Sequence, residues 1–321
     1  MRILVTGGAG FIGSHLCERL TFEGHKVTAI DNFSTGNALN LNGLAESSNF
    51  NLVEGSILDT TILNPLVKDA EYIFHLAAAV GVFNIVNNPL ASLLTNIRGT
   101  ENVLEAAHAT KTPVFLTSSS EVYGKNISDS LKESDDRILG SPVTLRWSYS
   151  EAKAIDESLA YAYFVEKQLE TRIVRFFNTV GPRQLGAYGM VVPRFVKAAL
   201  ANEPITIYGD GNQTRCFAHV YDVIDAVMAI AFANNTIGKV INVGNNFEIS
   251  INGLAKKIIE KTGSKSEIVY VPYAEAYGDG FEDMERRVPN IDLINQLVGW
   301  KPNRDLSTMI TDISVDMKKD S

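Results

Sequence analysis

Short apolar runs alternate with helix-like stretches along the first half of the chain, and this alternation limits the possible folds more than any other feature. The runs are rich in β-branched residues, and they lie at 1–7, 25–31, 50–55, 71–77, 112–119 and 171–177. Helix-like stretches between them include 12–22, 91–109 and 150–169. Strands that are apolar on both faces and separated by helices indicate a parallel sheet covered on both sides. The sequence therefore predicts an α/β fold with a doubly wound parallel sheet.

After residue 178 the pattern becomes irregular, with a helix predicted near 191–202. A second helix at 219–233 and a strand at 238–244 are expected to return to the sheet. Ligands of such sheets bind beyond the carboxyl ends of the strands, so we expect the site there. The predicted division is a main domain of 1–178 joined by 219–245, and a smaller, partly interleaved α/β lobe of 179–218 and 246–321.

Composition excludes several classes of partner. The chain has 321 residues, 45% of them hydrophobic, and can bury a sizeable core. Its net charge of −8 argues against nucleic acid, because phosphate contacts rely on clustered Lys and Arg. Cys17 and Cys216 give neither a disulfide framework nor a metal-binding spacing. No run resembles a signal peptide or the ~20 apolar residues of a membrane helix, so we expect a cytoplasmic protein without metal, membrane or nucleic-acid partners.

A glycine-rich turn, TGGAGFIG, ends the first predicted strand, and its glycines have the spacing G-x-x-G-x-x-G. Glycine permits a tight turn and lets a pyrophosphate approach the backbone, where the N-terminus of the next helix stabilises its charge. The turn lies between a strand and a helix, as a dinucleotide site requires. We therefore assign to cofactor binding Gly7, Gly10, Phe11, Ile12 and Gly13.

An acid, Asp31, closes the second predicted strand, close to the ~20-residue offset expected for a carboxylate that binds a ribose. Its charge would repel the additional phosphate of NADP, and Asn32 and Phe33 supply no compensating cation. The sequence therefore predicts NAD as the cofactor, with Asp31 and Asn32 among its contacts. The alternative is an ordinary turn followed by a strand-end aspartate.

Two further stretches fit the same cofactor site. Small residues follow the fourth predicted strand, and the backbone at Leu76, Ala77 and Ala78 would let a dinucleotide lie against it. Asn96 is a polar residue inside an otherwise amphipathic helix. It is either a cofactor contact or a local helix cap.

The stretch RWSYSEAK places Tyr149 and Lys153 four positions apart, so both point to one face of a predicted helix. A free tyrosine has a pKa near ~10 and is a poor base at neutral pH. A nearby ammonium and the positive nicotinamide would both favour the phenolate and lower that pKa. A Tyr–Lys pair alone is common on surface helices, but this one accompanies a dinucleotide site and a serine cluster that ends the fifth strand. We interpret the pair as catalytic.

These motifs occur together with TSSSEVYG (117–124), RFFNTVGPR (175–183) and YGDGNQTRCF (208–217). From residue 1 to about residue 301 the chain resembles the extended short-chain dehydrogenase/reductase family, and in particular its nucleotide-sugar epimerases, dehydratases and decarboxylases. The resemblance implies a Rossmann-like NAD-binding domain. Relatives usually have an acid that binds the adenine amine where this chain has Ser56, which leaves the backbone near Ile57 for that contact.

The resemblance also implies a mechanism. Tyr149 would accept the proton of the sugar C4 hydroxyl while hydride passes from C4 to NAD⁺. Lys153 would hold the nicotinamide ribose, and Ser119 would share the hydrogen bond to the C4 oxygen. The implied substrate is a UDP-sugar, because Asn178 and Arg215 match positions that contact the diphosphate and nucleoside in relatives. The alternative for Arg215 is a surface salt bridge. The positions that match substrate contacts are Ser119, Ser120, Asn178, Val192, Tyr208, Arg215, Asp283 and Arg287.

Three outcomes compete after the 4-keto sugar forms. A 4-epimerase inverts the hydroxyl, a uronate decarboxylase loses CO₂ from C5, and a 4,6-dehydratase eliminates water. Ser119, where the decarboxylases and dehydratases usually have Thr, and VVPRF (191–195) favour epimerisation. We place epimerisation first and decarboxylation second. Dehydration comes last because Ser120 precedes Glu121 where an Asp-Glu pair is usual. A further alternative is a relative that binds NAD without turnover, but it would need a broken Tyr–Lys pair, and both residues are present.

Decarboxylation depends on two charged residues. Glu121 lies in S-E-V-Y-G, as in decarboxylases, and both RWSYSEAK and 277–291 resemble those enzymes. Arg287 falls at a position that faces the sugar in epimerases, where a guanidinium would suit a carboxylate. The alternative for Glu121 is a strand-end acid that pairs with a local arginine.

Relatives often pair through the helix that carries the tyrosine. The apolar positions of 157–167 would allow a two-helix contact, so we expect a homodimer, although those positions could equally be buried within one chain.

Overall fold

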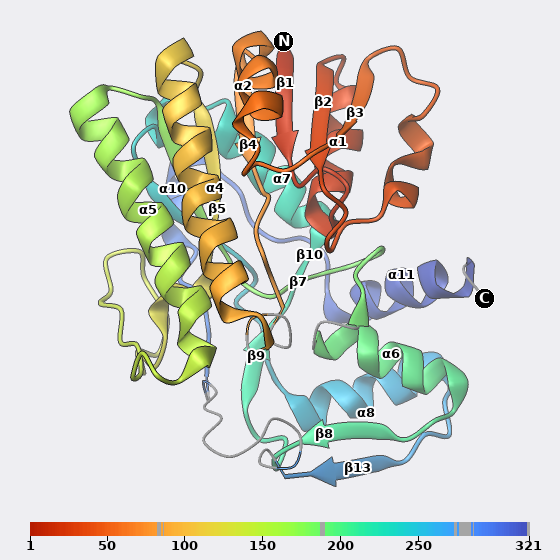
Figure 1. The fold of residues 1–321 in the computed structure, drawn as a ribbon. Helices are drawn as coiled ribbons and strands as arrows, with labels where there is room; N and C mark the ends of the chain where they lie inside the picture. The colour runs from red at the N-terminus through yellow and green to blue at the C-terminus, as the bar shows by residue number, and fades with distance from the viewer. Residues whose placement is uncertain are drawn as a thin grey trace.

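Figure 1 shows the computed structural model of the chain, which describes residues 1–81, 85, 87–186, 190–272, 275, 284 and 286–319. Its centre is a seven-stranded sheet in the order β11-β6-β5-β4-β1-β2-β3, and each neighbouring pair is parallel. The strands are β1 (Arg2–Thr6), β2 (Lys26–Asp31), β3 (Phe50–Glu54), β4 (Tyr72–His75), β5 (Val114–Ser119), β6 (Thr171–Phe176) and β11 (Val240–Val243). The predicted doubly wound parallel sheet is confirmed.

Helices cover both faces of this sheet (Figure 1). One face packs against α1 (Phe11–Phe22), the 3₁₀ helix η1 (Ala38–Leu44) and α7 (Val220–Ala231), which the 3₁₀ turn η5 (Asn234–Thr236) follows. The other face packs against α2 (Thr60–Asp69), α4 (Pro89–Thr110) and α5 (Ser148–Lys167). Neighbouring strand residues point to opposite faces of the sheet. Because helices bury both faces, every position of a strand must be largely apolar.

The two cores divide each strand in this alternating way. Phe115 belongs to the core beneath α1 and α7, and the next residue, Leu116, belongs to the core beneath α2, α4 and α5. Phe74 and Ile73 divide in the same manner on β4. The strand ends at the carboxyl edge of the sheet are therefore fixed in position from both sides.

A smaller lobe lies beside the sheet (Figure 1). It has its own core, formed by residues such as Val196, Leu254 and Ile310. Two short strand pairs join it, one parallel and one antiparallel, and β7 pairs with β10 where the chain passes between lobe and sheet. The elements are β7 (Thr179–Val180), α6 (Val191–Ala201), β8 (Ile205–Tyr208), β9 (Thr214–Cys216), β10 (Ala218–His219), β12 (Glu248–Ser250), α8 (Ile251–Thr262), β13 (Ile268–Val271) and α11 (Leu306–Lys319).

One late segment packs against the main sheet although the sequence analysis assigned it to the lobe. Ile294 of α10 (Asp292–Val298) and Trp300 are buried in the core beneath α1 and α7. The Trp300 indole N–H donates to the backbone oxygen of Asp222 at 3.0 Å. The chain therefore packs against the sheet at Ile294 and Trp300, and it then passes to the lobe, where α11 joins the core.

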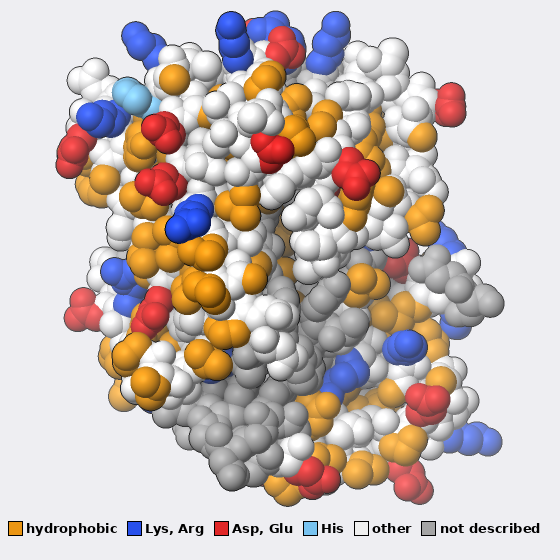
Figure 2. Space-filling view, in the orientation of Figure 1, with side chains coloured by type: hydrophobic (Ala, Val, Ile, Leu, Met, Phe, Trp, Pro, Cys, Tyr) orange, Lys and Arg blue, Asp and Glu red, His pale blue; other side chains and the backbone are white. Residues whose placement is uncertain are grey.

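Hydrophobic side chains gather on the face of the molecule that carries α4 and α5 (Figure 2). On α5, Ile155, Tyr161 and Val165 are 42%, 51% and 57% exposed. These side chains are about half exposed, which suits a contact between two copies, whereas Ala160 is buried within the chain and Leu159 and Tyr163 pack against the same core. The homodimer stays a prediction. Within the described part of the chain, no helix is both long and apolar enough to cross a membrane.

The buried face of β5 gives a test of this packing. Leu116 is fully buried, so Leu116→Ala should lower the free energy of unfolding by about 2–5 kcal/mol through lost contacts and a residual cavity. Leu39→Ala is the control, because Leu39 is 68% exposed and its loss should cost well under ~1 kcal/mol. Urea denaturation measures both, and equal costs would contradict the described core.

Candidate active site

The glycine-rich turn lies at the carboxyl end of β1, directly against the loop after β4. Gly7 has φ +71°, and a Cβ there would lie 2.8 Å from the Ala77 nitrogen. A Cβ on Gly13 would lie 2.1 Å from the Gly7 oxygen. Among the described residues, no side chain caps the N-terminus of α1, where Gly10 precedes Phe11 and Ile12. The turn therefore fits a dinucleotide phosphate, because its backbone is bare and uncapped N–H groups lie behind it.

Asp31 ties this turn to the end of β2. Its carboxylate accepts hydrogen bonds from the backbone N–H groups of Ala9 at 2.9 Å and Phe33 at 2.8 Å. Burial raises the pKa of Asp31, and these two hydrogen bonds act against that shift. Asn32 is exposed and accepts from the Ser34 N–H. Asp31 thus shapes the turn, a role additional to the predicted ribose contact.

Asn96 holds the loop that follows β4. Its side-chain oxygen accepts from the Ala79 N–H at 2.7 Å, and its amide donates to the Ala79 oxygen at 3.3 Å. Both partners lie outside its own helix, so the side chain does not act as a local helix cap. In the same loop, the N–H groups of Leu76 and Ala77 donate to Thr6, and Ala78 is half-buried. The loop is therefore held against β1 beside the glycine-rich turn.

The predicted adenine contact lies after β3. Ile57 is buried against Gly99 of α4, and its backbone oxygen accepts from the Asn102 amide at 3.0 Å. The Ser56 hydroxyl accepts from the Leu58 N–H at 3.2 Å. Ser56 thus serves a local turn, and an adenine contact through Ile57 stays a prediction.

The structure brings Tyr149, Lys153 and Ser119 together at the carboxyl end of β5. Tyr149 and Lys153 lie in the first turns of α5, and Ser119 ends β5 and hydrogen-bonds Tyr149. The Lys153 ammonium donates to the Thr117 backbone oxygen at 3.1 Å and to Asp156 at 3.2 Å. The Tyr–Lys face predicted from the spacing of four is present.

The pKa of Tyr149 lies above its ordinary value, opposite to the shift that the sequence suggested. Burial is the main cause, and the negative charges of Glu121 and Asp156 add to it. The Ser119 hydrogen bond and the Arg146 guanidinium favour the phenolate. Of the two positive charges expected to lower this pKa, only the Lys153 ammonium belongs to the chain, and Asp156 is its partner.

A charged cluster lies next to this tyrosine. Glu121, in the 3₁₀ turn η2 (Ser120–Tyr123), lies between Arg146 of η3 (Leu145–Trp147), at 2.6 Å, and Arg287, at 2.5 Å. Arg287 also donates to Ser120 at 3.3 Å and to the Asn178 side-chain oxygen at 3.2 Å. Sequence analysis left open whether Glu121 is catalytic or pairs with an arginine, and the structure shows that it pairs with two.

The two guanidiniums fix the charge of Glu121. Burial alone would raise the pKa of this carboxyl, but Arg146 and Arg287 hold it well below its usual range. Glu121 is therefore ionised at every physiological pH. One carboxylate between two guanidiniums leaves the cluster with one positive charge in excess, in a place where all three side chains are at most 15% exposed.

The remaining predicted substrate residues lie in or beside the lobe. Asn178 donates to the Cys216 backbone oxygen at 2.9 Å, and the nearly buried Arg215 donates to the Thr214 oxygen. The Tyr208 ring faces the Arg194 guanidinium, 4.2 Å from the ring centre. Val192 is fully buried in the core of the lobe, which leaves only its backbone for a ligand. Asp283 lies outside the described residues.

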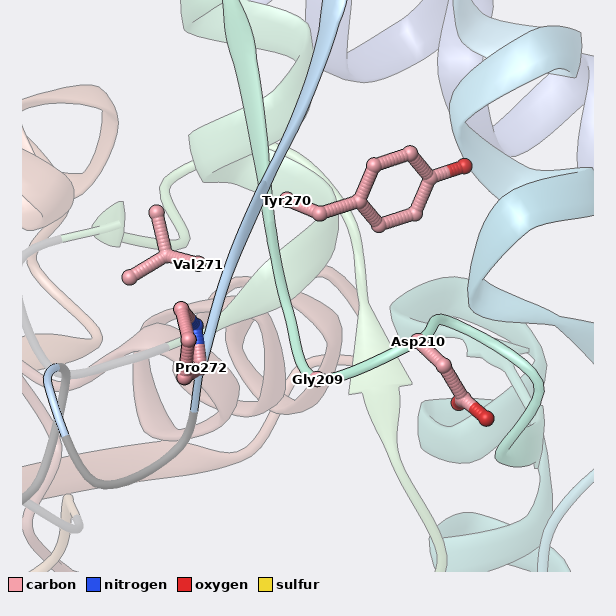
Figure 3. Close-up of a pocket in the computed structure, with 5 residues that line it drawn as sticks. All are labelled: Gly209, Asp210, Tyr270, Val271 and Pro272. Carbon is pink, nitrogen blue, oxygen red and sulfur yellow. The ribbon is translucent and has the colours of Figure 1, made fainter.

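A cavity of about 480 Å³ opens in the lobe, where β8 and β13 end (Figure 3). It is lined by Gly209, Asp210, Tyr270, Val271 and Pro272. None of these residues belongs to the charged cluster or to the Tyr149 site. The cavity therefore neighbours Tyr208 and does not contain the reacting groups.

Two charged residues of this site, Arg146 and Asp156, were not predicted from the sequence. Arg146 lies three positions before Tyr149 and Asp156 three positions after Lys153, so both were visible as neighbours of the motif. Their partners were not visible, because an i+3 spacing shows which face of a helix a residue shares and not which atom it binds. Among the described residues, no group of acidic, histidine and cysteine side chains could hold a metal ion.

Comparison with known proteins identifies the family. The sequence model of the NAD dependent epimerase/dehydratase family matches residues 3–244. The chain is 41% identical over 303 residues to a UDP-N-acetyl-alpha-D-glucosaminuronate decarboxylase of Bacillus cytotoxicus, covering 94% of this chain and 93% of that protein. It is 37% identical to a UDP-glucuronic acid decarboxylase 1 of Xenopus tropicalis, covering 94% of this chain and 68% of that protein.

Among solved structures, UDP-glucuronic acid 4-epimerase from Bacillus cereus, in complex with UDP-glucuronic acid and NAD, superposes with a TM-score of 0.90. It is 29% identical, and the match covers 100% of both chains. The fold and the Tyr–Lys site thus define an enzyme of the extended short-chain dehydrogenase/reductase class. The chain belongs to the NAD dependent epimerase/dehydratase family.

Asp31 provides a test of the cofactor prediction. Isothermal titration calorimetry should show tighter binding of NAD⁺ than of NADP⁺, because the buried carboxylate opposes a second phosphate. Asp31→Asn removes the charge and should narrow the ratio of the two dissociation constants by roughly tenfold. Glu46→Gln, at an exposed position, is the control and should leave the ratio unchanged. Equal affinity of the unmodified protein for both cofactors would reject the assignment.

Proposed function

We propose that the chain is a UDP-hexuronate decarboxylase, which oxidises the sugar at C4 and then releases its carboxyl group as CO₂. Sequence analysis placed 4-epimerisation first. Two findings move decarboxylation ahead of it. The charged cluster beside Tyr149 has one positive charge in excess, and sequence relatives covering nearly the whole chain are named as uronate decarboxylases.

The observation that carries the proposal is the buried guanidinium of Arg287. Its side chain is only 8% exposed, and its Nε has no hydrogen-bond partner among the described residues. A desolvated guanidinium with an unused donor suits a carboxylate, which accepts in a bidentate fashion. A neutral hexose would give this buried charge nothing to compensate it.

NAD, when bound, supplies the acceptor for the hydride at C4 and later returns it. The chain would hold this cofactor with the glycine-rich turn, Asp31 and the Lys153 ammonium. Tyr149 and Ser119 would hold the C4 oxygen, with Tyr149 as phenolate taking the hydroxyl proton. Its pKa, raised by burial, must fall for this step, and the positive charge of the bound cofactor acts in that direction.

With a ketone at C4, the carboxylate on C5 becomes that of a β-keto acid. The C5–C6 bond breaks, CO₂ leaves, and the electron pair forms an enolate on the C4 oxygen. The Tyr149 hydroxyl and Ser119 would donate hydrogen bonds to this oxygen as its charge develops. Water supplies the proton at C5, and Tyr149 returns its proton to the C4 oxygen on reduction.

Glu121 would favour the loss of CO₂ by its charge. Arg146 keeps it ionised even where a substrate carboxylate takes over a donor of Arg287. Two carboxylates near one guanidinium repel each other, and the repulsion falls as the substrate charge moves from the carboxylate to the C4 oxygen. The interaction is thus less unfavourable in the transition state than in the bound substrate, which is the condition for catalysis.

The second candidate is 4-epimerisation of the same kind of sugar. It is favoured by the solved UDP-glucuronic acid 4-epimerase, whose fold matches over its whole length. A carboxylate seat at Arg287 would serve both reactions. They differ in the fate of the keto sugar: an epimerase rotates it and reduces it with its carboxyl group intact, whereas a decarboxylase releases that group as CO₂.

Product analysis separates the two candidates. Purified protein with NAD⁺ is incubated with UDP-glucuronate, UDP-N-acetylglucosaminuronate, UDP-glucose and UDP-N-acetylglucosamine. We expect CO₂ and a UDP-pentose from a uronate, and no conversion of the neutral sugars. A uronate recovered with an inverted C4 hydroxyl and no CO₂ would favour epimerisation, and turnover of a neutral hexose alone would reject the uronate substrate.

Arg287→Ala tests the carboxylate seat. Loss of a charge-assisted pair with the substrate should lower kcat/KM for the uronate by on the order of 30- to 1000-fold, or about 2–4 kcal/mol. Arg286→Ala is the matched control, because the neighbouring Arg286 is 41% exposed and binds Glu248. Its kcat/KM should stay within about threefold of the unmodified value. A uronate-active enzyme indifferent to Arg287→Ala would refute the seat.

A further inference from the structure

The Lys153 ammonium is bound to a carboxylate that the family motif does not include. Its Nζ lies 3.2 Å from the Asp156 oxygen, one turn further along α5, and 3.1 Å from the Thr117 backbone oxygen. The side chains of Lys153 and Asp156 are 3% and 0% exposed. Two of the three ammonium protons are thus directed by the chain, and one is left for a ligand.

Stability does not explain this pair. Burying two opposite charges costs desolvation energy that their attraction barely recovers, so apolar residues of similar volume would serve a helix equally well. The next residue, Glu157, shows what a structural acid does here. It binds the Arg175 guanidinium of β6 through both oxygens, at 2.9 and 2.7 Å. The two consecutive acids therefore have different partners, and only Asp156 faces the catalytic lysine.

A buried polar network continues from Asp156 toward the cofactor loops. The Thr100 hydroxyl of α4 stabilises the charged form of Asp156 and lies 3.1 Å from the His75 Nε2. The His75 Nδ1 lies 2.7 Å from the Thr6 hydroxyl, which accepts from the Ala77 N–H. Burial and the nearby Lys153 lower the pKa of His75 to about 3, so this histidine stays neutral. Thr100, His75 and Thr6 carry no charge, so Asp156 is the one charged member of this network beside Lys153.

Among the described residues, the charged groups that act on Tyr149 come from several elements. They are Glu121 on η2, Arg146 on η3 and Asp156 on α5, together with Arg287 through Glu121 and Lys153 through Asp156, and the neutral His75 on β4 lies near Lys153. Glu121, whose charge also raises the pKa of Tyr149, is held by two arginines. Asp156 has one cation, and that cation is the one that the tyrosine needs.

We propose that Asp156 is a positioning residue, which anchors the Lys153 ammonium and, by its negative charge, sets the pH at which Tyr149 ionises. The inference rests on the proposed role of Tyr149 as the base, and it holds whichever sugar is turned over. Removing the charge of Asp156 leaves the Lys153 charge uncompensated. The loss of repulsion from the Asp156 carboxylate and the uncompensated Lys153 charge both stabilise the phenolate, so the midpoint of Tyr149 ionisation moves to lower pH.

The test is a titration of tyrosinate absorbance with NAD⁺ bound. Each protein is compared with its own Tyr149→Phe partner, so that the difference isolates Tyr149. Asp156→Asn should lower the midpoint by roughly one pH unit, and the acid limb of kcat/KM should shift by the same amount. Asp156→Ser also removes the charge and should give the same shift, which covers a failure of the first variant to fold.

Two variants serve as controls. Asp156→Glu keeps the charge and should keep the midpoint within a few tenths of a unit of the unmodified protein. Glu166→Gln removes a charge from the exposed far end of α5 and should not move it. A uniform loss of activity in Asp156→Asn and Asp156→Ser with an unmoved midpoint would overturn the proposal and leave Asp156 a structural role. If the unmodified protein and Tyr149→Phe titrate alike, Tyr149 is not the base, and the mechanism fails together with this inference.

Discussion

In the part of the chain that the structure describes, the strongly buried charges near Tyr149 are held by partners of opposite sign, and the arrangement of the site depends on this pairing. Glu121 lies between two guanidiniums, and Lys153 binds Asp156. An unpaired charge at such depth would cost several kcal/mol, so the partners must arrive together from separate elements. The parallel sheet makes this possible, because its strands all end at one edge. The cluster of Glu121, Arg146 and Arg287 has one positive charge in excess, and this is why we propose a carboxylate substrate.

Most of the fold could be predicted because its signals are local. Apolar runs without polar interruption mark strands buried on both faces, and the seven-stranded sheet follows from their alternation with helices. The glycine-rich turn could also be predicted, because only glycine fits its positions. A Cβ at Gly7 or Gly13 would meet the backbone at less than contact distance. The return of α10 to the sheet was not readable, because it depends on where Ile294 and Trp300 find an apolar surface.

The catalytic motif of the site was predicted from the sequence, but the ion pairs that its residues form were not. Tyr149, Lys153 and Ser119 followed from spacing and resemblance, and they lie together at the end of β5. Arg146 and Asp156 carried no signal of their own, because their importance comes from atoms that the fold brings within about 3 Å. The pKa of Tyr149 in the chain alone is raised for the same reason. Burial and two nearby acids outweigh the favourable charges of the chain.

Epimerisation and decarboxylation share every step up to the 4-keto sugar, so the residues common to both cannot distinguish them. The difference lies in what the enzyme does with the group on C5. An epimerase must release the keto sugar for rotation, whereas a decarboxylase needs its carboxylate held beside a charge that disfavours it. Under the proposed function, Arg287 would hold the carboxylate and the charge of Glu121 would disfavour it, which is the second requirement.

A crystal structure of the Tyr149→Phe protein with NAD⁺ and UDP-glucuronate tests this account most directly, since the variant should bind the sugar without turning it over. The account predicts the substrate carboxylate within roughly 2.7–3.2 Å of the Arg287 guanidinium, with the C4 hydroxyl facing residue 149 and Ser119. A carboxylate directed to solvent, with Arg287 still bound only to Glu121, Ser120 and Asn178, would contradict it.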